Sequence, residues 1–150
     1  MASRVSLVTL LGRPAYRLGA GRDGITVFAD NGEQLTEIGK SEAVQIAAQF
    51  MRAPASQLGY ALQTSADVWT LGVRRQLPLH KLRINDSDRT ELYVSPHTGE
   101  VVLLTTRRTR MLAWVAAIPH WMYFTPLRVR DSLWNSVVLW TSGKIGRAHV

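Results

Sequence analysis

His120 is the side chain in this sequence that is best placed for chemistry. It lies in a run without formal charge, Met111–Phe124, which also contains two tryptophans and a tyrosine. An imidazole in apolar surroundings is costly unless its ring nitrogens find partners. A histidine at the level of lipid headgroups finds them in water or phosphate, without any chemistry. The residues alone leave open whether a ligand or solvent takes that place.

The other reactive side chains show no catalytic or metal-binding spacing. The chain has no cysteine, which excludes disulfides, thiol catalysis and cysteine-bound metals. It also has no Gly-x-Ser-x-Gly motif and no phosphate loop, so a hydrolase is not expected. His80 and His97 have no close second histidine and are predicted to be surface residues. Asp86, Asp88 and Glu91 lack the glycine and spacing of a calcium loop and are predicted to form a solvated hairpin.

Basic residues indicate the kind of partner. Lys and Arg number 18 against 11 Asp and Glu, with a net charge of +7, which favours an anionic partner, either nucleic acid or lipid headgroups. The arginines stand beside aromatic and apolar residues and no recognition helix is visible, so a lipid bilayer is expected as partner and nucleic acid is not. The residues predicted at the membrane interface are Arg107, Arg108, Arg110, Trp114, Trp121, Tyr123, Arg128 and Trp134.

The elements that must position these residues are strands and one helix. Apolar residues at helical spacing follow Ser41, which can cap a helix over residues 41–52. One helix on an antiparallel sheet is the economical arrangement, because each element has one apolar face to cover, and the predicted fold class is therefore α+β. Alternation and turn residues predict strands at Val5–Leu11, Ala15–Leu18, Gly24–Ala29, Asp67–Val73, Leu79–Ile84, Glu91–Val94 and Val101–Thr105.

The region after Arg110 is predicted to contain membrane helices. Met111–Phe124 is too short for a crossing, which needs about 20 apolar residues, so it fits an interfacial or a buried packing helix. A second apolar stretch begins at Leu133 and breaks off near Ser142; it is predicted to be the start of a truncated transmembrane helix. Residues 144–150 resemble one reading frame of a sequencing adapter and are predicted to be a non-native tail.

Two parts of the chain resemble each other. Pro14–Leu18 with Val27–Glu33, and Leu79–Arg83 with Leu92–Val101, each consist of a basic strand, a turn, a second strand and a Gly-Glu hairpin. This pattern resembles the closing half of PepSY domains, with Ser95 where aspartate is usual. Only the second copy has its helix, and no signal peptide is visible at the start. The first copy is therefore predicted to be the remnant of a truncated module.

The string Ile118–Arg128 and the stretch Leu133–Trp140 resemble the PepSY-associated transmembrane family. The resemblance implies a bacterial inner-membrane protein, often linked to iron uptake, whose PepSY module faces the periplasm or another extracytoplasmic side. Some members are haem-containing ferric-siderophore reductases, so it also implies haem as cofactor, a ferric siderophore as substrate and His120 as an axial haem ligand.

PepSY domains are also associated with inhibiting or regulating peptidases. The alternative is therefore a non-catalytic module that binds a protein partner. In either case the chain is predicted to be a fragment without activity of its own. Its predicted divisions are a remnant of a first half-module (1–36), a PepSY module (37–106), an interfacial helix with the start of a transmembrane helix (107–143), and the tail (144–150).

Overall fold

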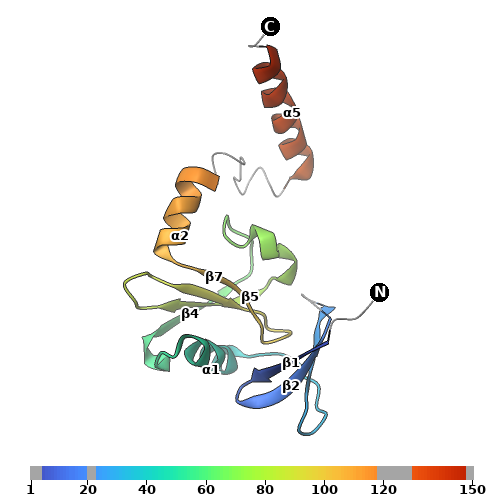
Figure 1. The fold of residues 1–150 in the computed structure, drawn as a ribbon, viewed down its shortest axis with the longest axis vertical. Coiled ribbons are helices and arrows are strands. Elements are labelled where there is room, and N and C mark those ends of the chain that lie inside the picture. The colour runs from blue at the N-terminus through green and yellow to red at the C-terminus, as the bar shows by residue number, and fades with distance from the viewer. Residues whose placement is uncertain (1–4, 20–22, 118–129, 148–150) are drawn as a thin grey trace.

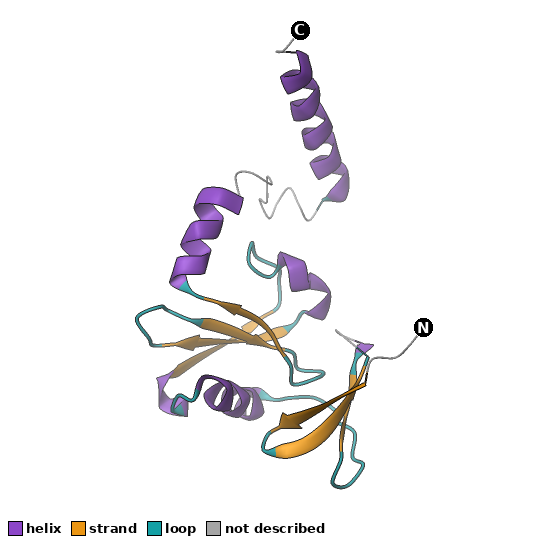
Figure 2. Ribbon diagram, viewed as in Figure 1, coloured by secondary structure: helices purple, strands orange, loops and turns teal. Residues whose placement is uncertain are grey.

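Two antiparallel sheets form the frame of the molecule (Figures 1 and 2). The computed structural model describes residues 5–19, 23–117 and 130–147. The first sheet has the order β1-β2-β3 and the second the order β4-β5-β6-β7. The predicted α+β class is confirmed. The strands are β1 (Val5–Leu10), β2 (Arg13–Leu18), β3 (Ile25–Phe28), β4 (Leu58–Gln63), β5 (Leu79–Ile84), β6 (Glu91–Val94) and β7 (Val101–Thr105).

Helix α1 (Lys40–Met51) covers one face of the second sheet (Figure 1). Ala43, Ile46 and Ala47 are its buried residues and recur at helical spacing, as the sequence predicted. Phe50 and Met51 belong to the same predicted apolar set, but Phe50 is 56% exposed and Met51 is partly buried. The prediction that Ser41 caps the helix is wrong. The N-cap is Gly39, and the Ser41 hydroxyl instead donates to the Glu42 carboxylate.

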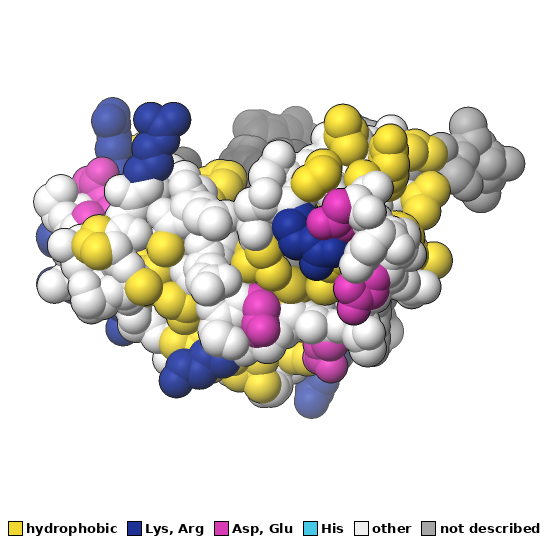
Figure 3. Space-filling model, turned by 90° about the horizontal axis from the view of Figure 1, so that it is seen from below, with side chains coloured by type: hydrophobic (Ala, Val, Ile, Leu, Met, Phe, Trp, Pro, Cys, Tyr) yellow, Lys and Arg dark blue, Asp and Glu magenta, His cyan; other side chains and the backbone are white. Residues whose placement is uncertain are grey.

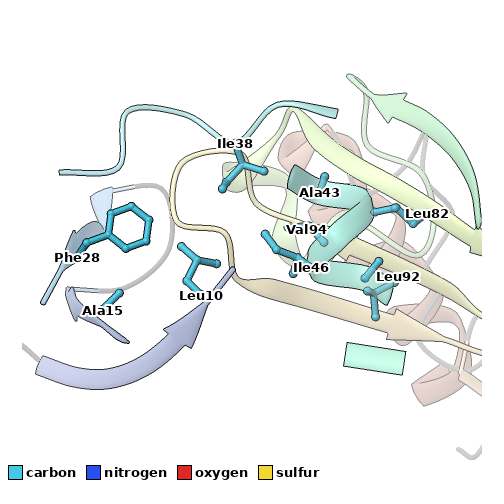
Figure 4. Close-up of a cluster of buried hydrophobic side chains, with 10 residues drawn as sticks. Leu10, Ala15, Phe28, Ile38, Ala43, Ile46, Leu82, Leu92 and Val94 are labelled. Atoms are coloured by element: carbon cyan, nitrogen blue, oxygen red, sulfur yellow. The ribbon is translucent and has the colours of Figure 1, made fainter. Parts of the chain in front are cut away.

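A single hydrophobic cluster joins both sheets and α1 (Figure 4). Leu10, Ala15 and Phe28 enter it from the first sheet, and Leu82, Leu92 and Val94 from the second. Ile38 lies between the two groups on the segment that leads into α1, where its amide donates to the carbonyl of Pro96. The residues of the first sheet that alternate with Leu10, Ala15 and Phe28 face the other way.

That outward face of the first sheet is apolar. Its exposed side chains pair across the strands, Leu7 opposite Tyr16 and Val5 opposite Leu18. Figure 3 shows hydrophobic side chains gathered over β1–β3, at the right of the view. The exposed fractions are 57% for Val5, 66% for Leu7, 47% for Tyr16, 36% for Leu18 and 43% for Ile25.

The two turns that carry the repeated Gly-Glu pair have the same hydrogen bonds. In the first, the amide of Phe28 donates to the carbonyl of Glu33 and the amide of Gly32 to the carbonyl of Phe28. In the second, Ser95 donates to Glu100 and Gly99 to Ser95 in the same way. Both glycines have positive φ, +72° and +65°, a conformation that glycine adopts at little cost. The similarity between the two segments therefore extends to their backbone geometry.

The segment between α1 and β5 differs from the prediction. Asp67–Val73 is not a strand, because the Asp67 carboxylate accepts hydrogen bonds from the amides of Trp69 and Thr70 and closes a turn. A 3-10 helix, η3 (Leu71–Gln76), follows this turn. The strand of this region is β4, which comes earlier, directly after the short 3-10 helix η2 (Ala55–Gln57).

Helical segments follow β7. Helix α2 (Arg107–Leu112) begins with a capping box in which Thr106 and Thr109 each accept the other's amide, and a π-helical turn η4 (Ala113–Ala117) continues it. Helix α5 (Asp131–Arg147) contains the predicted membrane stretch. Among the described residues no helix is long and apolar enough to cross a membrane. The predicted transmembrane part is thus not supported, since α5 has 17 residues and includes Asp131, Lys144 and Arg147.

Candidate functional site

The face of the second sheet opposite α1 carries a cluster of charged side chains. Cross-strand partners point to the same face of a sheet. Arg83 pairs with Glu91, and Lys81 pairs with Tyr93. These four residues, together with Arg110 from α2, form what we call the Glu91 cluster.

Glu91 lies at the centre of this cluster. Only 7% of the residue is exposed, yet three cations surround its carboxylate. Lys81 Nζ lies 3.0 Å from Oε2, Arg83 Nη2 lies 3.3 Å from Oε1, and Arg110 Nη1 lies 3.6 Å from Oε2. The Tyr93 hydroxyl also donates to Oε2, at 3.2 Å. A buried carboxylate of this kind is tolerated because cations and donors replace its water.

These neighbours set the ionisation of the cluster. Burial raises the pKa of the Glu91 carboxyl, but the hydrogen bond and charge of Lys81 and the charge of Arg110 outweigh burial and bring the pKa below its ordinary value. Burial and the Glu91 charge raise the pKa of Tyr93 well above its ordinary value. At neutral pH the cluster therefore holds an ionised glutamate and a neutral tyrosine.

Beside the cluster the surface forms an open groove with a volume of about 570 Å³. Arg83, Arg89 and Arg110 supply its cations, and Glu91 is the one carboxylate among its lining residues. Arg110 is fixed in place, since its guanidinium donates to Thr105 Oγ1 and to the carbonyl of Arg89, both at 2.8 Å. Arg83 is different, because 67% of its side chain is exposed despite its contact with Glu91. The complete lining is Gln57, Gly59, Arg83, Ile84, Asn85, Arg89, Glu91 and Arg110.

A tight turn presents Arg89 to this groove. Asp86 holds the turn through hydrogen bonds from the amide and the hydroxyl of Thr90, at 2.8 and 2.6 Å. Arg89 adopts a φ of +47° within it and is exposed. The hydrogen bonds from Thr90 lower the pKa of the Asp86 carboxyl, so this acidic residue is committed to the turn. The groove therefore has an excess of positive charge.

Two sequence predictions about this region are wrong. Glu91 is buried rather than solvated, because the basic residues that neutralise it come from a neighbouring strand and from α2. His80 is also buried, at 6% exposed, rather than on the surface. One ring nitrogen of His80 lies 2.9 Å from the Tyr60 hydroxyl and the other 2.7 Å from the carbonyl of Ile38. Both partners are distant in sequence, so spacing alone gave no sign of them.

The predicted interface residues are only partly described. Arg107 and Arg108 are exposed on α2, and Trp114 is 56% exposed on η4. Arg110 turns toward Glu91 and has a side chain that is 17% exposed. Trp134 is half-buried on α5. His120, Trp121, Tyr123 and Arg128 lie outside the described residues, so their roles stay predictions.

The part of the chain that the structure describes contains no group of three histidine, cysteine, aspartate or glutamate side chains that could hold a metal ion. Haem at His120 is a separate matter and stays a prediction. No protein-family model, curated protein or solved structure matches this chain. The Glu91 cluster and its groove are thus the features on which a functional proposal can rest.

Proposed function

We propose that the described part of the chain is a PepSY-like, non-catalytic module that binds an anionic segment of a protein partner in the groove beside Glu91. The observation that carries this proposal is the unequal exposure of the basic side chains. Lys81, Arg83 and Arg110 all contact the Glu91 carboxylate, but Lys81 and Arg110 are largely buried, whereas 67% of the Arg83 side chain is exposed. Arg83 and the exposed Arg89 both line the groove. A carboxylate that enters the groove would meet two guanidinium groups suited to bidentate binding.

The ionisation of the cluster favours binding over catalysis. A general base works best with a pKa near the operating pH. The pKa of Glu91 is shifted away from neutrality, and its oxygens already accept hydrogen bonds from three directions. Such a carboxylate orients arginines but is a poor proton acceptor.

The wider setting is proposed on the sequence resemblance alone. It places the module in a PepSY-associated protein of the bacterial inner membrane, on the extracytoplasmic side, with links to iron uptake or to control of a peptidase. Binding of a protein segment fits the second of these roles directly. Ferric-siderophore reduction would depend on His120 and haem, and the groove neither requires nor opposes it.

Titration of the 150-residue chain with fluorescein-labelled hexaglutamate tests the groove, with anisotropy as readout. Binding should weaken as salt rises, because exposed charge pairs are screened. The double variant Arg83→Gln/Arg89→Gln should lose roughly fivefold or more in affinity, about 1 kcal/mol for two exposed pairs.

The matched control is Arg52→Gln/Arg74→Gln, which removes two exposed arginines that do not line the groove. This control should bind hexaglutamate as the unchanged chain does. The proposal fails if both double variants bind alike, or if hexaglutamine binds as tightly as hexaglutamate.

A further inference from the structure

The geometry points to an extended acidic peptide that adds to the free edge of β4 as a fifth strand, with every second side chain acidic. This inference rests on the proposed function, because it names the form that the anionic partner segment takes. Addition of a strand to a sheet edge gives affinity through main-chain hydrogen bonds, and alternate side chains give specificity.

β4 offers a free edge. Within the described part of the chain its one strand neighbour is β5. The amide of Ile84 donates to Thr90, toward β6, and the amide of Asn85 donates to Gln57, toward β4. Successive residues of a strand direct their backbone groups to opposite sides. Since Ile84 faces β6 and Asn85 faces β4, Arg83 also faces β4 and exchanges backbone hydrogen bonds with its partner Gly59. The backbone groups of Leu58, Tyr60 and Leu62 must then point away from β5, toward the free edge.

On the face of the sheet that carries the Glu91 cluster, β4 has small side chains along this edge. Gly59 and Ala61 are the β4 residues on this face, opposite Arg83 and Lys81, and both are exposed. A Cβ added at Gly59 would lie 3.7 Å from the carbonyl oxygen of Arg83 and meet nothing closer. Small side chains on β4 therefore leave Arg83 accessible from the edge, whereas the side chain of Lys81 is only 16% exposed. A second groove of about 160 Å³ lies here and shares Gly59 and Arg83 with the larger one.

The spacing of strands sets which residues of an added peptide reach these cations. Strands lie about 4.8 Å apart, so the peptide would be roughly 10 Å from β5. Glutamate on one side and arginine or lysine on the other can span that distance across a glycine or an alanine. Two acidic residues at positions i and i+2 would then face Arg83 and Lys81.

The residues between the acidic ones would lie on the opposite face, toward α1. There β4 presents Leu62, which is 52% exposed, and Tyr60, which is half-buried. Apolar side chains at these intermediate positions would cover Leu62. The expected partner thus alternates acidic and apolar residues over about five positions.

A second copy of this chain is a poorer occupant of the edge. β4 carries no acidic side chain, so pairing β4 with β4 would place no carboxylate beside Arg83 or Lys81 of either copy. An acidic strand would supply one, so the charge on β5 favours an acidic strand over a second copy.

The test uses the 150-residue chain and a labelled peptide that alternates glutamate and valine. A peptide of the same composition with its glutamates contiguous, and one with N-methyl groups on alternate amides, are the peptide controls. The alternating peptide should bind about tenfold tighter than either, since only it can form both the backbone ladder and the charge pairs. Arg83→Gln should reduce this binding about two- to threefold, since it removes one exposed pair.

Leu62→Pro tests the edge itself. It removes an outward N–H that β4 does not use in its ladder, so the fold should persist, as proline is tolerated on edge strands. Its matched control is Leu62→Ala, which keeps the N–H. Both variants lose the apolar contact of Leu62, so the backbone N–H is tested by the difference between them: Leu62→Pro should bind the alternating peptide about tenfold more weakly than Leu62→Ala does.

The outcomes separate the two proposals. If Arg83→Gln weakens binding but Leu62→Pro and N-methylation do not, strand addition is overturned and the groove stands. If the substitutions in the groove change nothing, the proposed function itself fails. If the chain dimerises in size-exclusion chromatography and Leu62→Pro abolishes the dimer, a second copy occupies the edge and the acidic-strand inference is overturned.

Discussion

Glu91 shows how one buried carboxylate can organise the side chains around it. Its oxygens draw Lys81 and Arg110 to positions where their side chains are 16% and 17% exposed. Without the carboxylate these two cations would repel each other in a poorly solvated place. Glu91 is therefore as much a structural residue as a part of the groove.

Replacement of Glu91 should be costly for stability. Glu91→Gln leaves Lys81 and Arg110 without their counter-ion, and breaking a buried pair costs about 3 kcal/mol or more in free energy of unfolding. Urea unfolding followed by circular dichroism measures this loss. Glu100→Gln is the control, because Glu100 is 40% exposed and 3.7 Å from Arg17, and it should cost less than about 1 kcal/mol. Equal losses for the two variants would contradict the central role of Glu91.

Stability should also fall in acid for the same reason. The pKa of Glu91 is lower in the folded chain than its ordinary value of about 4.5, so the unfolded chain binds its proton more readily. The contribution of Glu91 is then complete above about pH 4.5 and is lost as the pH falls through the folded pKa. In Glu91→Gln the free energy of unfolding, measured by urea titration at a series of pH values, should fall less steeply as the pH is lowered. An unchanged dependence on pH would show that other carboxyl groups cause the loss.

Single residues were the hardest feature to predict from the sequence. Burial of Glu91 and His80 depends on partners that lie in other strands, in α2 or in the segment before α1. Charge and spacing along the chain suggested solvated positions for both. The predicted strand Asp67–Val73 was wrong for a related reason, since the Asp67 carboxylate accepts hydrogen bonds from the local backbone and so favours a turn.

At the level of elements, the two Gly-Glu turns offer a matched comparison. Both turns have the same hydrogen-bond pattern and a glycine with positive φ. They differ in their surroundings: a Cβ at Gly99 would lie 2.6 Å from Leu10 Cδ1, whereas a Cβ at Gly32 would meet nothing within 4 Å. Gly32→Ala should cost about 1 kcal/mol for the left-handed conformation. Gly99→Ala should cost roughly 1 to 3 kcal/mol more, because it overpacks the core. Thermal or urea unfolding of both variants measures the difference, and equal costs would contradict the contact with Leu10.

Helix α2 carries the described arginines of the predicted membrane interface. Arg107 and Arg108 are exposed, and each basic residue near an anionic surface contributes about 1 kcal/mol. Arg107→Gln/Arg108→Gln should therefore weaken binding to phosphatidylglycerol vesicles about tenfold or more, as measured by co-sedimentation. Arg74→Gln/Arg75→Gln on η3 is the charge-matched control. An equal effect in the two variants would indicate non-specific attraction rather than an interface on α2.

Elements with a clear pattern were predicted well, and those that depend on small residues were not. Leu79–Ile84, Glu91–Val94 and Val101–Thr105 are strands in the structure with the bounds that the sequence predicted. β4 was missed because Gly59 and Ala61 weaken its strand signal. These small residues are the same ones that open the β4 edge in our inference.

For the whole molecule, the haem prediction can be tested directly. If the family resemblance holds, the protein that carries this sequence in its host should show a haem absorption band when purified. His120→Ala should remove or shift that band, while His97→Ala should leave it unchanged. A purified protein without any haem band would contradict the haem prediction and favour the binding module.

The arrangement of the whole chain could be predicted only in part. Alternation in the strands and the spacing in α1 were sufficient for an α+β fold. They did not show that two sheets share one hydrophobic cluster, because that depends on Leu10, Ala15 and Phe28 facing inward together. The transmembrane prediction relied on eight apolar-rich residues from Leu133, too few to define a crossing without the rest of a helix.

The contact of Leu10 with the turn at Gly99 has a consequence for how the chain loses its structure. Opening of the first sheet would expose part of the cluster on which α1 and the second sheet depend. The two sheets should therefore unfold as one cooperative unit, with slow amide hydrogen exchange that is lost together in β2 and β5. A peptide bound at the β4 edge would then protect the amides of the first sheet as well, although it touches none of them.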